Sequence, residues 1–207
     1  MIASDGWLPR VPLADALAVA QQIYGQLDPS CERLAIAGSI RRFRPDVGDI
    51  ELVAIPRYEN RPVDVGLFET RWAPVSVLAE TLAMLEGKTP GRGEHSAMLE
   101  RLSGGERYIK LRHLRSGLQV DLFLTTPEQW GLILLIRTGP ADYSRGLVTE
   151  ARRRGFHVAH GRLFHGAGHN RNDGFCDCTQ PIPTPTEESV YAALGLPFEP
   201  PGRRGVA

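Results

Sequence analysis

The chain has 207 residues, 42% of them apolar, which is enough for one good-sized domain or two small ones with a packed core. Its 24 basic and 24 acidic side chains balance, so any binding to nucleic acid must come from local patches. No apolar run is long enough to cross a bilayer, and the first residues lack the pattern of a signal peptide. Three cysteines are too few for a disulfide framework. We therefore expect a cytoplasmic protein.

A helix and two strands are predicted at the start of the chain. Apolar residues recur at helical spacing over residues 11–27. Residues 34–37 form a short apolar strand that ends in the dipeptide Gly38-Ser39, and the next strand covers residues 50–55. The Gly-Ser turn is therefore held between two strands.

Two acids alternate with apolar residues where the second of these strands begins. Because side chains alternate between the faces of a strand, Asp49 and Glu51 point one way and Ile50 and Leu52 point the other. Two neighbouring carboxylates repel each other unless a positive charge lies between them. A hard divalent cation such as magnesium, which prefers oxygen ligands, is the usual solution.

The middle of the chain is predicted to contain a loop, a helix and a hairpin. Residues 57–73 read as a loop, residues 75–85 as a helix, and residues 88–106, rich in glycine and charge, as irregular. Residues 108–114 and 118–125 read as two strands joined by a tight turn.

A third acid lies inside the second strand of this hairpin. Asp121 is surrounded by apolar residues, and an unpaired acid is costly to bury there. A metal ion shared with Asp49 and Glu51 would give Asp121 the partner that it needs.

The last third of the chain mixes helices with short strands. Helices are predicted over residues 128–136 and 142–154, and a small sheet over residues 156–183. Thr186 is placed to cap a final helix, and the tail after residue 197 is predicted to wrap over the surface. The helix that carries Trp130 is apolar, so we expect this side chain in the core.

Histidine and cysteine gather in one segment of this region. Two interpretations stay open, namely a structural zinc site or ordinary core and surface residues, since the spacing matches no common zinc finger. The residues concerned are His157, His160, His165, His169, Cys176 and Cys178.

These motifs, taken together, resemble the nucleotidyltransferase superfamily and, over nearly the whole chain, the family X DNA polymerases. The signature is Gly-Ser, nine residues, and then acid-apolar-acid. The matching segments are Gly38-Ser39-Ile40-Arg41-Arg42, Val47-Gly48-Asp49-Ile50-Glu51, Val120-Asp121-Leu122, Pro127-Glu128-Gln129-Trp130-Gly131, Thr138-Gly139, Thr186-Glu187-Glu188 and Leu194-Gly195-Leu196-Pro197.

The resemblance implies an α+β fold with two domains. Residues 1–137 would form a nucleotidyltransferase palm, a mixed sheet with flanking helices, and residues 138–207 a small α+β thumb. What precedes the palm is too short for the lyase domain of larger members, so abasic-sugar lyase activity is not expected.

The resemblance also implies a two-metal site. Asp49, Glu51 and Asp121 would hold two Mg²⁺ ions, and Asp121 would accept the proton of the primer 3′-hydroxyl. Gly38, Ser39, Arg42 and Gly139 would bind the nucleotide, with Gly38 allowing a close approach of the phosphates. Arg41 is interpreted as a surface charge, and for Arg107 a substrate contact and a solvent-exposed position stay equally open.

The chain departs from the family pattern at several positions. Family members usually carry Tyr-Phe before Thr-Gly, where this chain has Ile136-Arg137, so Arg137 would contact the nucleotide or primer and sugar discrimination is in question. The longer second acid, Glu51, favours the softer geometric demands of Mn²⁺. Small side chains at Ala141 and Ser144, and Val148 in place of a basic residue, imply low fidelity or a different reading of the nascent base pair.

Seven arginines against two acids give the segment from Arg137 to Arg171 a local positive charge. Arg145, Arg152 and Arg153 would bind DNA phosphates, and the alternative is a solvated helix face. The expected partners are a dNTP and a primer–template or gapped DNA, without a membrane, for a monomeric DNA polymerase that releases pyrophosphate. Two alternatives stay open: a template-independent transferase or one acting on RNA or protein, and an inactive binding module.

Overall fold

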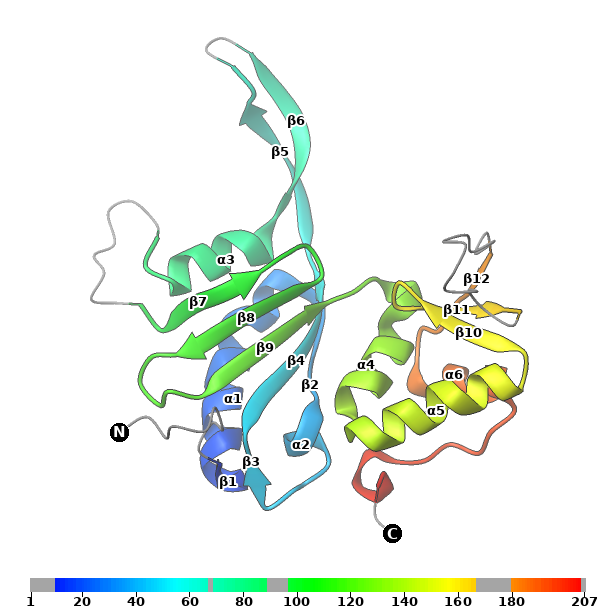
Figure 1. The fold of residues 1–207 in the computed structure, drawn as a ribbon. Coiled ribbons are helices and arrows are strands. Elements are labelled where there is room, and N and C mark those ends of the chain that lie inside the picture. The colour runs from blue at the N-terminus through cyan, green and yellow to red at the C-terminus, as the bar shows by residue number, and fades with distance from the viewer. Residues whose placement is uncertain (1–9, 67–68, 89–96, 167–179, 206–207) are drawn as a thin grey trace.

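The computed structural model describes residues 10–66, 69–88, 97–166 and 180–205, which form two lobes (Figure 1). We call the part from β1 to β9 the sheet lobe and the part from η3 to η4 the C-terminal lobe. None of the helices in the described ranges is both long and apolar enough to span a bilayer.

A five-stranded sheet is the frame of the sheet lobe. Its two central strands, β4 and β9, run parallel to each other, and every other neighbouring pair is antiparallel. The strands, in order across the sheet, are β2 (Cys31–Ile36), β4 (Asp49–Pro56), β9 (Gln119–Leu124), β8 (Tyr108–His113) and β7 (Leu99–Gly104).

Two helices, α1 (Leu13–Leu27) and α3 (Val77–Leu85), cover one face of this sheet. Ile50, Leu52 and Ala54 of β4 are fully buried in the core beneath them, as the alternation in the sequence predicted. The remaining short elements of the lobe are β1 (Val11–Pro12), which pairs with β3 (Asp46–Val47), and η1 (Asp28–Ser30).

The opposite face of the sheet is only half covered. Helix α4 (Trp130–Thr138) packs Trp130 and Leu134 against Val53, Ile55 and Phe123, in the later halves of β4 and β9. The earlier halves of the same strands carry the acids, and Asp49, Glu51 and Asp121 are half-buried there. The covered half thus anchors the strands while the uncovered half presents the polar side chains.

The C-terminal lobe packs on the other side of α4. Leu132 and Leu135 meet Leu163, Val190 and Leu194 in a second core, so α4 contributes to both lobes. The predicted cap is confirmed, since Thr186 and Ser189 form a reciprocal capping box. The elements are η3 (Pro127–Gln129), α5 (Ala141–Arg153), β10 (Phe156–Ala159), β11 (Arg162–His165), β12 (Pro181–Ile182), α6 (Glu187–Leu194) and η4 (Pro201–Arg203).

The loop predicted over residues 57–73 is wrong, because this segment enters a two-stranded antiparallel ribbon. Strands β5 (Tyr58–Asp64) and β6 (Thr70–Ser76) pair along their full length, and the ribbon extends away from the sheet (Figure 1). A ribbon with neither face buried has no apolar alternation to reveal it, and its prolines read as breaks.

The irregular segment predicted over residues 88–106 is partly wrong for a similar reason. Its end forms the edge strand β7, in which only Leu99 is buried, while residues 89–96 lie outside the described residues. The hairpin of β8 and β9 and the small C-terminal sheet are confirmed, and the helices predicted over 11–27 and 75–85 are confirmed with starts two residues later. Trp130 is buried as expected, with 1% of its surface exposed.

The histidine and cysteine segment is only partly visible. His157 is buried and stacks on Phe164, and His165 packs against Phe156, so both behave as packing residues. His169, Cys176 and Cys178 lie outside the described residues, and the zinc alternative stays open for them.

Candidate active site

The Gly-Ser turn lies directly against the acidic strand. Gly38 has a φ of 62°, and a Cβ at this position would lie 2.0 Å from Glu51 Oε2, so glycine alone fits between the turn and the carboxylate. The turn forms the short helix α2 (Gly38–Arg41), and the Ala37 amide donates to the Glu51 carbonyl at 2.8 Å. The hydroxyl of Ser39 is buried, and no described residue hydrogen-bonds to it.

The three acids lie on one face of the two parallel strands. Glu51 of β4 is opposite Asp121 of β9, and Asp49 is opposite Gln119. Residues paired in this way share a face, and side chains two apart in a strand also share it. The prediction that the acids of the two strands come together on one face is therefore confirmed.

Crowding of the acids changes their protonation. Burial, and then the carboxylates of Asp49 and Asp121, raise the pKa of Glu51 to about 8. Burial and the Asp121 carboxylate also raise the pKa of Asp49. Without a cation, this face of the sheet resists carrying all of its negative charges at once.

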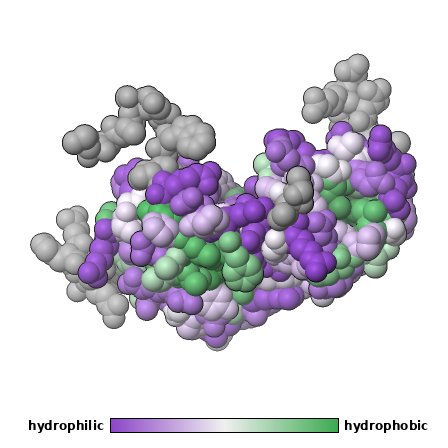
Figure 2. All heavy atoms as spheres, turned by 90° about the horizontal axis from the view of Figure 1, so that it is seen from below, coloured by the Kyte–Doolittle hydropathy of each residue, from purple (hydrophilic) through white to green (hydrophobic). Residues whose placement is uncertain are grey.

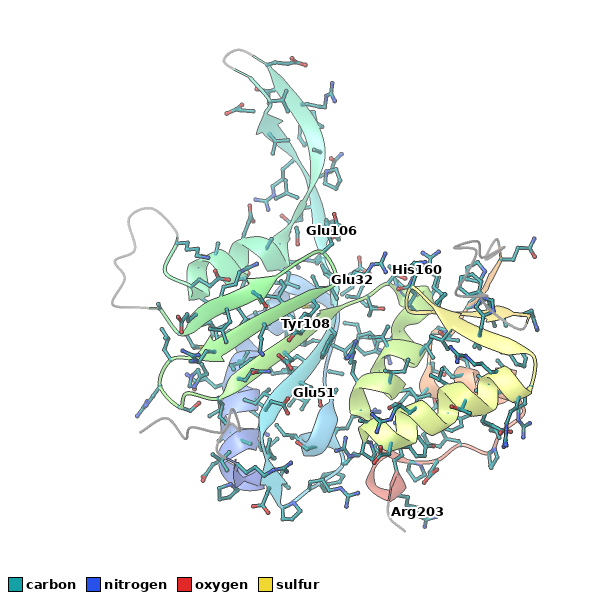
Figure 3. The ribbon with its side chains drawn as sticks, viewed as in Figure 1. Glu32, Glu51, Glu106, Tyr108, His160 and Arg203 are labelled. Atoms are coloured by element: carbon teal, nitrogen blue, oxygen red, sulfur yellow. The ribbon has the colours of Figure 1, made fainter. Side chains whose placement is uncertain are left out.

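Asp121 has polar partners that the sequence did not suggest. Tyr108 on β8 donates its hydroxyl to Asp121 Oδ1 at 2.9 Å, and the Gln119 amide donates to both carboxylate oxygens, at 2.9 and 3.1 Å. Burial and the hydrogen bond to Asp121 raise the pKa of Tyr108 to about 12, so the phenol stays a donor at neutral pH. These hydrogen bonds orient the Asp121 carboxylate. Figure 3 labels Tyr108 and Glu51 on the sheet that carries the acids.

The donor set suits a hard divalent cation. Asp49, Glu51 and Asp121 share one face of the sheet, the pKa values of Asp49 and Glu51 are raised, and a cation between the carboxylates would relieve the repulsion. Within the described residues, however, no three histidine, cysteine or acidic side chains are already arranged around one point as a metal site. Asp121 would exchange its bonds to Gln119 and Tyr108 for an ion.

The raised pKa of Glu51 predicts a pH dependence for the metal-free protein. The pKa of Glu51 is near 4.5 in the unfolded chain and about 8 in the folded protein. The folded state therefore binds this proton more tightly, and the stability that it gains below pH 4.5 is lost as pH rises from 4.5 to 8. The loss from this group is at most ~1.4 kcal/mol per pH unit. Glu51→Gln should remove most of this slope and make the protein more stable than wild type at about pH 8.5. Urea unfolding in EDTA measures it, and a wild-type slope retained in the variant would contradict it.

Arg42 and Gly139 meet at the end of α4. Arg42 Nη1 donates to the carbonyl oxygen of Thr138, and its Nε is buried with no partner among the described residues. Burial lowers the pKa of Arg42, and the Glu51 carboxylate opposes this shift. Gly139 has a φ of 63°, which strains any other residue, and a Cβ there would lie 3.2 Å from Arg42 Nη1, so the guanidinium would have to shift slightly. Two of the predicted nucleotide-binding residues are thus in contact.

Arg137 lies next to the acids. Its guanidinium lies 3.9 Å from the centre of the Phe123 ring, and Phe123 in turn stacks on Tyr108 with ring centres 5.1 Å apart. Its charge also lowers the pKa of Glu51, against the larger effects that raise it. A stacked arginine in this position is a rigid donor for an anionic ligand.

The interpretation of Arg41 as a surface charge is wrong. Its guanidinium binds Glu187 on α6 through two hydrogen bonds, at 2.8 and 2.5 Å, and donates to Thr138 Oγ1 at 2.7 Å. Arg204, fully buried, donates to the same Glu187 carboxylate at 2.8 Å. We call Arg41, Glu187 and Arg204 the arginine clamp, and it ties the Gly-Ser turn to the C-terminal lobe.

The arginines predicted to bind DNA lie on the exposed face of α5. Arg145 pairs with Asp142, Arg153 pairs with Glu150 at 3.7 Å, and Arg152 is exposed. Their role stays a prediction. The sequence reasoning missed two further cations, Lys110 and Arg112 on β8. They lie opposite Asp121 and Gln119 in the register of the sheet and share the face of these residues. Figure 2 shows that the surfaces of both lobes carry hydrophilic and hydrophobic areas.

Comparisons with known proteins point to one group of enzymes. Residues 133–205 match the family described as DNA polymerase beta thumb. The chain is also similar to DNA polymerase lambda of Rattus norvegicus, with 26% identity over 212 aligned residues that cover 97% of this chain and 34% of the relative. The chain therefore spans about a third of the length of that curated relative.

Proposed function

Because this chain is related to the family X DNA polymerases, we propose that it transfers a nucleotide from a dNTP to the 3′-hydroxyl of a DNA primer. A bond forms between the primer O3′ and the α-phosphorus, and the bond from that phosphorus to its bridging oxygen breaks, which releases pyrophosphate. The observation that carries the proposal is the face on which Glu51 and Asp121 are paired across parallel strands beside the Gly38 turn. Gap filling in DNA repair is the setting that we propose.

In this proposal each predicted residue has a physical task. The Ser39 hydroxyl and the Arg42 Nε, which are buried without partners among the described residues, would hydrogen-bond to the triphosphate, and Gly139 leaves room for Arg42. Asp49, Glu51 and Asp121 would hold two Mg²⁺ ions, with Mn²⁺ as a substitute. Such ions neutralise the charge that develops on the attacking and leaving oxygens.

Asp121 would also accept the proton of the primer hydroxyl. The Gln119 amide and the Tyr108 phenol, which both donate hydrogen bonds to this carboxylate, keep it oriented before DNA binds. We propose a palm over residues 1–137 and a thumb over residues 138–207, with Arg145, Arg152 and Arg153 on the DNA side of the thumb.

Primer extension tests the proposal. Gapped and single-stranded DNA are offered with each dNTP or NTP and with Mg²⁺ or Mn²⁺. Addition directed by the template on gapped DNA is expected. Extension of single strands regardless of sequence would instead favour a template-independent transferase, and DNA binding without any transfer would favour an inactive binding module.

Arg137→Phe tests the place of Arg137 near the sugar. An aromatic side chain there should raise the preference for dNTP over NTP by roughly tenfold, because a ring offers the 2′-hydroxyl no hydrogen bond, whereas a guanidinium can donate one to it. The ratio of kcat/KM for dNTP and NTP measures the effect. Arg145→Phe, on the exposed face of α5, is the control, and an unchanged ratio in the Arg137 variant would remove Arg137 from the sugar site.

A further inference from the structure

A cleft of about 860 Å³ separates the two lobes at the end of the sheet opposite to the acids. The sheet lobe contributes Tyr58, Arg107 and Thr125 to its lining, and the C-terminal lobe contributes His160 and Arg162. Figure 3 shows His160 across from the upper end of the sheet. The proposed transfer reaction uses none of these residues.

One buried hydroxyl of the cleft lacks a hydrogen bond and two of its arginines form no ion pair among the described residues. Thr125 is 7% exposed, and its hydroxyl is buried without a hydrogen bond from any described residue. An unsatisfied buried hydroxyl costs about 1–3 kcal/mol, which a ligand can recover. Arg107 and Arg162 are exposed, and neither lies within ion-pair distance of a carboxylate in the described ranges. The cleft therefore offers two available cations and one unused hydroxyl.

Exposed aromatic rings continue from the cleft onto the ribbon. Tyr58 begins β5 with 57% of its surface exposed, and Trp72 in β6 is 67% exposed. Trp72 is paired with Pro62, which lies four residues after Tyr58 and so on the same face of the ribbon. Both rings are exposed on one face of a ribbon that extends away from the sheet (Figure 1). They are the type of surface on which unpaired bases stack.

We propose that the cleft and this ribbon face bind the unpaired part of the template strand, an inference that rests on the proposed polymerase function. Tyr58 and Trp72 stack on bases, and Arg107 and Arg162 bind phosphates. Glu32 and Glu106, the two acids that also line the cleft, accept hydrogen bonds from base amino groups. A ligand with both flat rings and anionic links satisfies all of these groups, which an acidic peptide would not.

The distances suit this occupant. Ile55 at the cleft lies four positions after Glu51 on β4, which is about 13 Å along the strand. Because α4 covers the later half of β4, the template strand passes around this helix, and roughly four nucleotides, at about 3.4 Å each, are the shortest link between the acids and the cleft. The cleft has the volume of a small-ligand site, roughly 300–1,000 Å³, which is room for single unpaired nucleotides.

Fluorescence anisotropy with two DNAs tests the proposal without turnover. One is a blunt primer–template hairpin, and the other has a 5′ template extension of about eight nucleotides. In about 0.1 M salt, wild type should bind the extended DNA at least ~10-fold more tightly. Tyr58→Ala with Trp72→Ala should remove most of this gain, since stacking is worth about 1–3 kcal/mol per base. Val63→Ala, on the opposite face of the ribbon, should keep it.

The outcomes separate this inference from the proposed function. A gain that the double variant retains, or equal losses for both DNAs, would overturn the inference and leave the ribbon to a protein partner. Primer extension by wild type without any gain from the extended strand would sink the inference alone. A gain in affinity that depends on Tyr58 and Trp72, in a protein that extends no primer, would support binding of single-stranded DNA by the cleft and the ribbon face and would reject the polymerase proposal.

Discussion

Replacing Asp121 with asparagine should reduce primer extension by about 10²–10⁴-fold while the protein stays folded. The substitution removes the proton acceptor and one negative charge from the shared face, and a positioned general base contributes a factor of this size. Tyr108 can still donate to the remaining oxygen, so the local structure has no reason to collapse. Single-turnover extension on gapped DNA measures the loss.

The interpretation of this result depends on two controls. Asp46→Asn changes an exposed acid of β3 and should leave the rate within about twofold. The affinity of the Asp121 variant for DNA should also remain close to that of wild type. Activity above a tenth of the wild-type rate would exclude Asp121 from the proposed mechanism.

Glu187→Ala should lower the free energy of unfolding by about 3–5 kcal/mol, the largest effect on stability that we expect. Glu187 is 5% exposed and neutralises two arginines, and removing it leaves Arg41 and the fully buried Arg204 without a counter-ion. Burial raises the pKa of Glu187, but hydrogen bonds from Arg41 and Arg204 outweigh it and lower the pKa below the ordinary value. This part of the stability is therefore present above the ordinary pKa and is lost as pH falls through the lowered one.

Urea unfolding at neutral pH compares the variant with wild type. Glu188→Ala, at an exposed position in the same first turn of α6, is the matched control and should cost ~1 kcal/mol or less. The smaller change Glu187→Gln should fall between the two, because it removes the charge and keeps one acceptor. A Glu187→Ala cost equal to that of Glu188→Ala would show that the arginine clamp contributes nothing to stability.

Much of the site was predictable because it depends on local patterns. Strand alternation alone placed Asp49 and Glu51 on one face, and the apolar strand around Asp121 required a partner for that acid. Gln119 could also have been found, since it lies two residues before Asp121 and must share its face. Tyr108 required the register between β8 and β9, which no local pattern supplies.

What the sequence could not supply depends on contacts between distant segments. Arg41 and Glu187 are 146 residues apart, and nothing near Arg41 distinguishes it from a solvated arginine. The ribbon of β5 and β6 was missed because both of its faces are largely exposed, so burial left no periodic signal. The lining of the cleft, drawn from both lobes, also depends on tertiary structure alone.

Helix α4 has a consequence for the integrity of the whole molecule. Trp130 and Leu134 pack in the core against the sheet, and Leu132 and Leu135 pack in the core of the C-terminal lobe, so opposite sides of α4 hold the two lobes together. A fragment that contains only one of the lobes would expose one apolar side of this helix to solvent. On heating, the two lobes should accordingly unfold in one cooperative transition, as a single thermodynamic unit and not as two independent domains.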